Sequence, residues 1–245
     1  MKKLLLLSIL LFVCFYSQAQ DDKKVSVQAV YKSEIEAIAK DKRVQAAFKI
    51  IQDLEPQTMK NLVELTEIPA PPFMEQKRGE RFMQMMKAAG ADSIWVDEVG
   101  NVLALRKGKI KGKTVVLEAH LDTVFPIETD VKVKYKGDTL YAPGIGDDTR
   151  GLTMVLTIME AMKKAKVMTN ADVIFIGVVG EEGLGDLRGV KHLFKNGNRK
   201  IDAYIAIDGG DIGRINNMAL GSLRYRATFN GPGGHSWGAF GLANP

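Results

Sequence analysis

Three hydrophobic runs, each of the length of a buried β-strand, occupy the middle of the chain at residues 114–120, 172–179 and 203–207. A further apolar run, at 152–162, is hydrophobic nearly all round and predicts a buried helix. Strands that alternate with helices in this order predict an α/β fold, with a mostly parallel sheet and helices on both faces.

Weaker patterns predict further elements. Pro56 suits the first turn of a helix, and Gly90 is a usual helix stop. A Gly100-Asn101 turn between two apolar segments predicts a hairpin. The expected helices cover 21–45, 56–66, 75–89 and 187–195, and the hairpin strands cover 93–96 and 102–105.

The pattern changes near residue 213. Residues 220–230 alternate like an extended edge-type strand, and a glycine-rich segment that contains His235 follows. We therefore expect a main domain over 20–213 and the start of a second, smaller domain over 214–245.

Residues 1–19 have the features of a secretory signal peptide. Lys2 and Lys3 precede an apolar stretch, and Ser17-Gln18-Ala19 is a small-residue cleavage site. The stretch is shorter than the roughly 20 residues that a membrane-spanning helix needs. Removal of the segment would also remove Cys14, the only cysteine, so disulfides would not stabilise the mature chain. We expect an exported protein, periplasmic or secreted, with no membrane attachment after cleavage.

The charge pattern gives no support to nucleic-acid binding. The net charge of +5 is spread thinly along the chain, whereas nucleic-acid binding needs a basic face. The segment 108–114 is one residue short of a phosphate-binding loop and precedes a strand instead of a helix, so we do not expect nucleotide binding.

A histidine stands at the end of the first hydrophobic strand. Asp122 lies two positions after His120, and alternate residues of an extended chain point the same way. An imidazole that binds zinc commonly donates its second ring N–H to a carboxylate, and Asp122 suits that role. Taken alone, the pair has a simpler explanation as a surface histidine beside a loop.

The other candidates are acidic. Asp147 and Asp148 stand at the start of the predicted buried helix, where helix capping would also explain them. Glu181 and Glu182 follow the second strand, where two adjacent acids are costly unless a cation neutralises them or their roles differ. Asp208 follows the third strand and precedes two glycines, which also favour a turn.

The joint placement of these residues is the stronger argument. In open α/β sheets, ligands bind beyond the carboxyl ends of the strands, and all these side chains are expected at that edge. Imidazole and carboxylate ligands without sulfur are typical of zinc, manganese or cobalt hydrolase sites. Two ions about 3.5–4 Å apart would activate water and polarise an acyl oxygen, and a nearby glutamate would carry the proton to the leaving amine.

With these residues in place, the chain resembles the co-catalytic di-zinc amidohydrolase and exopeptidase family of aminoacylase, peptidase T, glutamate carboxypeptidase and succinyl-diaminopimelate desuccinylase. The resemblance covers Leu54 to Pro245. It is carried by four short motifs in the family's order: His120-Leu-Asp122-Thr, Gly146-Asp147-Asp148-Thr, Gly180-Glu181-Glu182-Gly183 and Gly233-Gly-His235-Ser236. Many members have lysine where Thr149 stands. The resemblance implies a zinc-exopeptidase-like catalytic domain over 20–213 and the start of an α+β lid or dimerisation domain over 214–245.

The resemblance also implies a role for each residue. His120 and Asp208 would bind one zinc ion, and Glu182 would bind a second. Asp147 would bridge the two ions. Asp122 would orient His120, Glu181 would be the general base, and the peptide bond after Asp147 would be cis. His235 would reach the acyl oxygen of a small peptide or N-acyl amino acid, often in the partner subunit's site, which implies a homodimer of the full-length protein.

Family members run well beyond the length of this chain and end with a final histidine ligand. Neither His192 nor His235 stands in that place, so we expect the chain to be a fragment of a longer protein. Two other functions remain open. One is a non-catalytic pseudo-enzyme that binds peptides. The other is a serine hydrolase that uses Ser236, which would need an acid and a histidine downstream.

Overall fold

The computed structural model describes residues 28–196, 200–210, 213–221, 223, 225–228, 230, 234–235 and 237–238. The predicted signal peptide at 1–19 and Ser236 lie outside the described residues. The chain divides into two compact units, Met1–Gly209 and Gly210–Pro245. Within the described residues, no helix has the length and the apolar character that crossing a membrane requires.

A five-stranded sheet forms the centre of the first unit. β3 pairs in parallel with β6 and β7, whereas β2 lies antiparallel to β6 and to β1. The strand order is β1-β2-β6-β3-β7, with β1 Ser93–Val96, β2 Val102–Arg106, β3 Thr114–His120, β6 Asp172–Val178 and β7 Ala203–Ala206. The predicted α/β fold with a mostly parallel sheet is confirmed, and the predicted hairpin adds the antiparallel edge.

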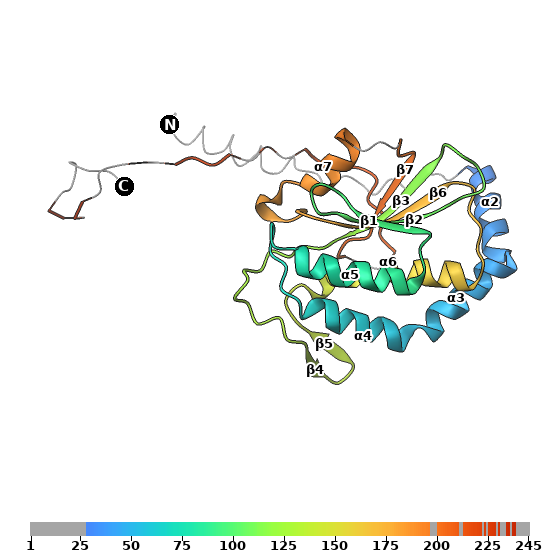
Figure 1. Cartoon of the computed structure of the whole chain (residues 1–245), viewed down its shortest axis with the longest axis horizontal. Helices are drawn as coiled ribbons and strands as arrows, with labels where there is room; N and C mark the ends of the chain where they lie inside the picture. The colour runs from blue at the N-terminus through green and yellow to red at the C-terminus, as the bar shows by residue number, and fades with distance from the viewer. Residues whose placement is uncertain are drawn as a thin grey trace, which may run out of the picture. The chain divides into compact units, whose positions relative to one another are not determined.

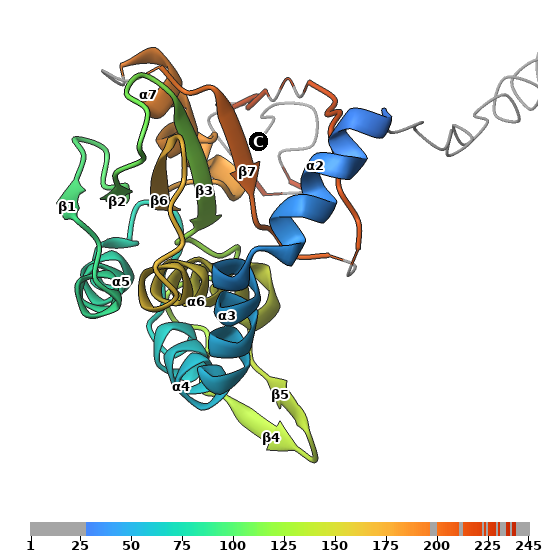
Figure 2. The ribbon, with the colours of Figure 1, turned by 90° about the vertical axis from the view of Figure 1, so that its right-hand side faces the viewer.

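Helices cover both faces of this sheet, as predicted (Figure 1). α5 (Gln76–Ala89) and α6 (Arg150–Lys164) lie against one face, and α7 (Arg188–Lys195) lies on the opposite face (Figure 2). α3 (Lys42–Asp53) and α4 (Glu55–Thr66) pack outside α6. Pro56 lies in the first turn of α4, and Gly90 ends α5 in the left-handed conformation, as predicted.

The two cores lie on the two faces of the sheet. The larger core, between α5, α6 and the sheet, contains the fully buried Phe82 and Phe175. Gly177 on β6 lies against it, since a Cβ there would be 2.9 Å from the Phe82 ring and 3.1 Å from Leu121. The smaller core packs Leu193 of α7 onto the central strands. Burial on both faces accounts for the continuous apolar sequences of these strands.

Three expectations differ from the structure. The helix expected over 21–45 is interrupted in its described part, because Asp41 separates α2 (Ala29–Lys40) from α3 and accepts a hydrogen bond from Arg43 N. β4 (Lys134–Lys136) and β5 (Thr139–Tyr141) form a separate hairpin that the pattern did not predict, because their side chains remain largely exposed. The strand expected over 220–230 is absent from the described part of that segment.

Candidate metal centre

The carboxyl ends of the three parallel strands bring the predicted ligands to one edge of the sheet. His120 is the last residue of β3, Glu181 and Glu182 follow β6, and Asp208 follows β7. Because β3 lies between β6 and β7 and runs parallel to both, the three strand ends are neighbours. This is the edge at which open α/β sheets bind their ligands.

Asp147 and Asp148 reach the same edge from a π-helical turn, η1 (Ile145–Thr149), that leads into α6. The peptide bond between them is cis, as the resemblance implied. Asp148 is buried and accepts hydrogen bonds from His120 N at 2.9 Å and Gly151 N at 3.1 Å. The exposed Asp147 instead places Oδ1 2.8 Å from His120 Nε2. Helix capping therefore explains Asp148 but not Asp147, which is available to a metal.

The backbone of Asp122 fixes the ring of His120. Nδ1 lies 2.9 Å from the Asp122 carbonyl oxygen and must carry a proton, because a carbonyl can only accept a hydrogen bond. The Asp122 carboxylate is farther away, with Oδ1 3.6 Å from Nδ1. Nε2 is therefore the nitrogen that can bind a metal. The contact that orients the ring comes from the carbonyl of Asp122, whereas the sequence pointed to its carboxylate.

Two groups of potential ligands share His120. The ligand atoms of His120, Asp147 and Asp208 lie within 4.8 Å of one another, and so do those of His120, Glu181 and Glu182. Asp208 Oδ1 is 4.0 Å from His120 Nε2. The first group contains the residues that the resemblance assigns to one zinc ion. The second contains Glu182, assigned to the other ion, and Glu181, assigned as the base.

The centre concentrates negative charge around one imidazole. Burial lowers the pKa of His120, but the surrounding aspartates, Asp122 first, outweigh this effect and raise the pKa to about 10. Burial also raises the pKa of Glu181 and of Glu182, and neighbouring carboxylates add to the increase. Among the described residues, no lysine or arginine forms an ion pair with either glutamate. A divalent cation would neutralise this excess of carboxylates, so the residues present fit a metal centre.

The carboxylate of Asp122 holds the turn that carries the two glutamates. This side chain is fully buried, and it accepts hydrogen bonds from Glu181 N at 3.1 Å and Glu182 N at 2.9 Å. Burial opposes the ionisation of Asp122, but its interactions with His120 and the two amides outweigh burial and keep its pKa below the usual range. Asp122 therefore connects the end of β3 to the turn after β6.

Sequence reasoning missed four residues around this centre. Glu75, Asn101 and Arg188 lie against the turn after β6, although their own segments carry no pattern of acids or histidines. The fourth, Glu118, precedes His120 by two positions on β3, and burial raises its pKa to about 7. An acid at an inward position of a buried strand was the available signal for Glu118.

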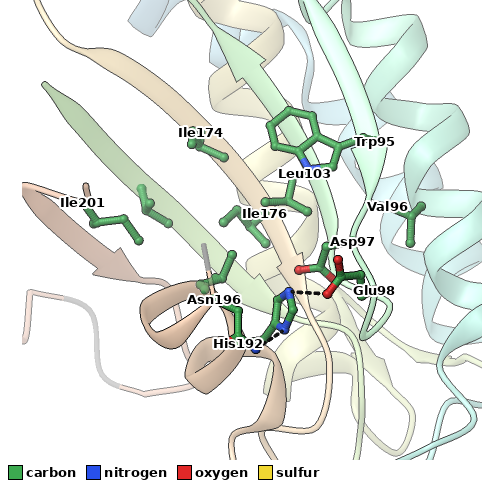
Figure 3. Close-up of a pocket in the computed structure, with 12 residues that line it drawn as sticks. Trp95, Val96, Asp97, Glu98, Leu103, Ile174, Ile176, His192, Asn196 and Ile201 are labelled. Atoms are coloured by element: carbon green, nitrogen blue, oxygen red, sulfur yellow. Dashed lines mark hydrogen bonds and ion pairs between the residues drawn. The ribbon is translucent and has the colours of Figure 1, made fainter. Parts of the chain in front are cut away.

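The described residues contain two further histidines, His192 and His235. His192, on α7, has Nε2 3.8 Å from the carboxylate of Glu98. It lines a cavity of about 360 Å³ between α7 and the sheet, whose apolar floor includes Ile174 and Ile176 (Figure 3). No candidate ligand lines this cavity, so it is distinct from the metal centre. His235 is an exposed residue of the second unit, and its Nδ1 accepts a hydrogen bond from Gly238 N.

Comparison with known proteins agrees with this geometry. Residues 116–224 match the model of Peptidase family M20/M25/M40. The chain is 29% identical over 169 residues to a putative LysW-lysine/LysW-ornithine hydrolase of Pyrococcus abyssi, covering 67% of this chain and 43% of that protein. A protein of the same description from Thermococcus kodakarensis is 33% identical over 133 residues. That match covers 54% of this chain and 34% of that protein. The chain therefore spans less than half the length of these relatives.

Solved structures have a similar fold. A tripeptidase from Staphylococcus aureus aligns with a TM-score of 0.51 at 24% identity, covering 64% of this chain and 44% of that chain. The di-peptidase Dug1p from Saccharomyces cerevisiae aligns with a TM-score of 0.55 at 17% identity. This alignment covers 67% of this chain and 40% of that chain. At these sequence identities, the structural similarity shows a similar fold and nothing further. The family resemblance is confirmed over residues 116–224, which match the family model and contain the first three of the four motifs.

Proposed function

We propose that this protein is a metal-dependent hydrolase that cleaves the peptide bond or N-acyl amide bond of a small peptide or acylated amino acid. The observation that carries the proposal is the position of His120 between two groups of carboxylates at the carboxyl edge of a parallel sheet. Hydrolase and peptidase are also the activities in the names of the similar proteins.

Two zinc ions, or manganese or cobalt in their place, would be held by His120, Asp147, Glu182 and Asp208. Imidazole nitrogen and carboxylate oxygen, without sulfur, are the donors that these metals take in hydrolases. When bound, the metal would supply Lewis-acid polarisation of the acyl oxygen and a water molecule of lowered pKa.

Glu181 is the residue that we assign to proton transfer. Burial raises its pKa, so its carboxylate can take a proton from the attacking water and later give it to the leaving nitrogen. The hydrogen bond from its backbone N–H to Asp122 fixes its position beside His120. Nε2 is the ring nitrogen that would give up its proton to a metal, because Nδ1 donates its own proton to a carbonyl and keeps it.

The variant Glu181→Gln tests this assignment. It keeps the size of the side chain and removes the proton carrier, so hydrolysis should fall by roughly 100-fold or more while bound metal is retained. The assay is a panel of dipeptides and N-acyl amino acids, with metal content measured on the same samples. Glu98→Gln, at an exposed position, is the matched control and should keep the parent rate. A Glu181→Gln variant as fast as the parent would refute the general-base role.

The same panel separates the alternatives. A protein that binds no zinc and hydrolyses none of the substrates would favour a non-catalytic module that binds peptides. Inhibition by a serine-trapping reagent, without inhibition by a chelator, would favour the serine mechanism with Ser236.

Export and dimerisation are further parts of the proposal. The signal-peptide pattern at 1–19 supports a periplasmic or secreted location, which fractionation of the producing cells would test. The resemblance supports a homodimer in which His235 reaches the substrate of the partner subunit. Light scattering on the full-length protein tests the dimer, and a monomer with full activity would exclude this role of His235.

A further inference from the structure

Every backbone N–H from residue 179 to residue 182 donates a hydrogen bond to a side chain from a distant segment. Val179 N donates to Asn101 Oδ1 at 3.0 Å, and Gly180 N donates to Glu75 Oε1 at 3.1 Å. The next two N–H groups donate to Asp122, as described above. Side-chain acceptors from three segments therefore determine the path of the turn that carries the two glutamates.

Glu75 and Arg188 form the part of this arrangement that the chemistry described so far does not use. Glu75 is buried, and its Oε1 accepts from Arg188 Nη2 at 2.7 Å as well as from Gly180 N. The guanidinium of Arg188 also lies over the ring of Phe73, 4.5 Å from the ring centroid, at a distance that allows cation–π attraction. One carboxylate oxygen thus joins the start of α7 to the turn after β6.

The turn packs directly onto this ion pair. Gly180 has a φ of +66°, and a Cβ on it would fall 1.9 Å from Arg188 Nη1, so glycine is required for both conformation and space. Asn101 closes the other side, because its Nδ2 donates to Gly189 O while Gly189 N donates to Val179 O. The first turn of α7 is therefore tied to the last residues before the acidic pair.

We propose that Glu75 and Arg188 act as a positioning pair for the carboxylates of Glu181 and Glu182. The inference rests on the proposed function, since it concerns the metal centre assigned there. The pair does not touch the ligand atoms; it fixes the backbone at Gly180, and the next two residues take their direction from that backbone. Groups that orient metal ligands commonly change metal affinity by roughly 10–100-fold when they are removed.

The test uses the 245-residue chain with the variants Glu75→Gln, Arg188→Gln and the double variant. Glu75→Gln keeps an oxygen for Gly180 N but removes the charge that faces Arg188. Zinc affinity, measured by calorimetry, should fall roughly 10-fold in each single variant. Because the two residues act as one unit, the effects of the two substitutions should not add. The double variant should bind zinc with the same affinity as whichever single variant has the lower affinity.

Two controls separate positioning from general stability. Glu64→Gln removes a surface ion pair with Arg81 and should leave zinc affinity unchanged. Leu105→Ala, at the opposite end of the sheet from the metal centre, lowers stability without touching the turn and should also leave the affinity unchanged. A loss of affinity in Leu105→Ala as large as that in Glu75→Gln would overturn the positioning role.

Amide hydrogen exchange at residues 180–182 gives a measurement that does not depend on metal. Exchange there should be faster in Glu75→Gln and in Arg188→Gln than in the parent. Arg188→Lys keeps the positive charge and should give intermediate exchange, which serves as the second variant if Glu75→Gln does not fold. Unchanged exchange in the arginine variants would overturn the proposal.

The proposed function can fail separately. A parent chain that binds no zinc would refute the metal centre, while the exchange measurements would still decide whether the pair holds the turn. A parent that binds zinc and hydrolyses amides, with both variants equal to it in affinity and exchange, would refute only the positioning role. In an active protein, kcat should fall more than KM rises, because the variants displace the proton carrier and leave the remaining substrate contacts intact.

Discussion

Replacing Asp122 by asparagine exchanges one carboxylate oxygen for an NH₂ group at the point where β3 meets the turn after β6. In the parent, each carboxylate oxygen accepts one backbone N–H, from Glu181 and from Glu182. Asparagine keeps one acceptor oxygen and puts an NH₂ group against the other N–H. The side chain is fully buried, so water cannot take over the lost interaction.

The structure allows the cost to be worked out. A hydrogen bond to a charged group contributes about 1.5–3 kcal/mol, and a buried N–H left unpaired costs about 1–3 kcal/mol. Since these two figures describe overlapping parts of one change, we expect Asp122→Asn to lower the free energy of unfolding by about 3 kcal/mol. The attraction between Asp122 and the buried Arg78 is lost as well and acts in the same direction.

Urea unfolding of the metal-free protein at pH 7 measures this change. With an m-value of about 3 kcal/mol/M, the midpoint should fall by about 1 M. Asp130→Asn is the matched control, because Asp130 also accepts a backbone N–H, from Lys132, but is exposed. The control should change stability by less than about 0.5 kcal/mol. Equal midpoints for Asp122→Asn and the control would refute the account of the buried carboxylate.

Three further outcomes are expected. Gly177→Ala should lower the free energy of unfolding by about 1–3 kcal/mol, because the new Cβ meets the buried ring of Phe82 and cannot be accommodated without a shift; an unchanged urea midpoint would contradict this. Burial raises the pKa of Glu118 to about 7 and that of Asp148 to about 8, so both carboxyls bind protons more tightly in the folded chain than in the unfolded chain. The metal-free protein should therefore lose stability as the pH rises from about 5 to 8.5, and a urea series that shows a rise instead would contradict the assignment. Removing metal with a chelator should lower the melting temperature and abolish hydrolysis, and zinc should restore both; activity that survives complete removal would exclude the metal mechanism.

The central strands could be predicted because their side chain patterns reflect burial on both faces of the sheet. The run that became β6 is apolar from Val173 to its end, the run that became β3 is interrupted by the single acid Glu118, and His120 ends β3 as predicted. The hairpin of β4 and β5 could not be predicted in this way, because its side chains bury little surface and leave no hydrophobic pattern. The break between α2 and α3 depends on the local capping by Asp41, which the pattern of apolar residues does not record.

The candidate ligands could be predicted from their positions at strand ends, but their individual environments could not. Residue type and spacing alone do not separate Asp147 from Asp148, although the resemblance assigned Asp147 to the metal. The turn of η1 places Asp147 Oδ1 beside the His120 ring and buries Asp148 against the His120 backbone. The contacts of Glu75 and Asn101 join residues 105 and 78 positions apart, so no local pattern reveals them. Such contacts follow from the assembled sheet and helices.

The turn after β6 is held through its main-chain N–H groups, which every amino acid except proline provides. Its shape is therefore independent of which side chains project from positions 181 and 182. One reactive side chain could therefore replace another at these positions during evolution, and the turn would still place the new side chain at the same point. A library randomised at these two positions should yield mostly folded proteins, with proline as the residue depleted most strongly.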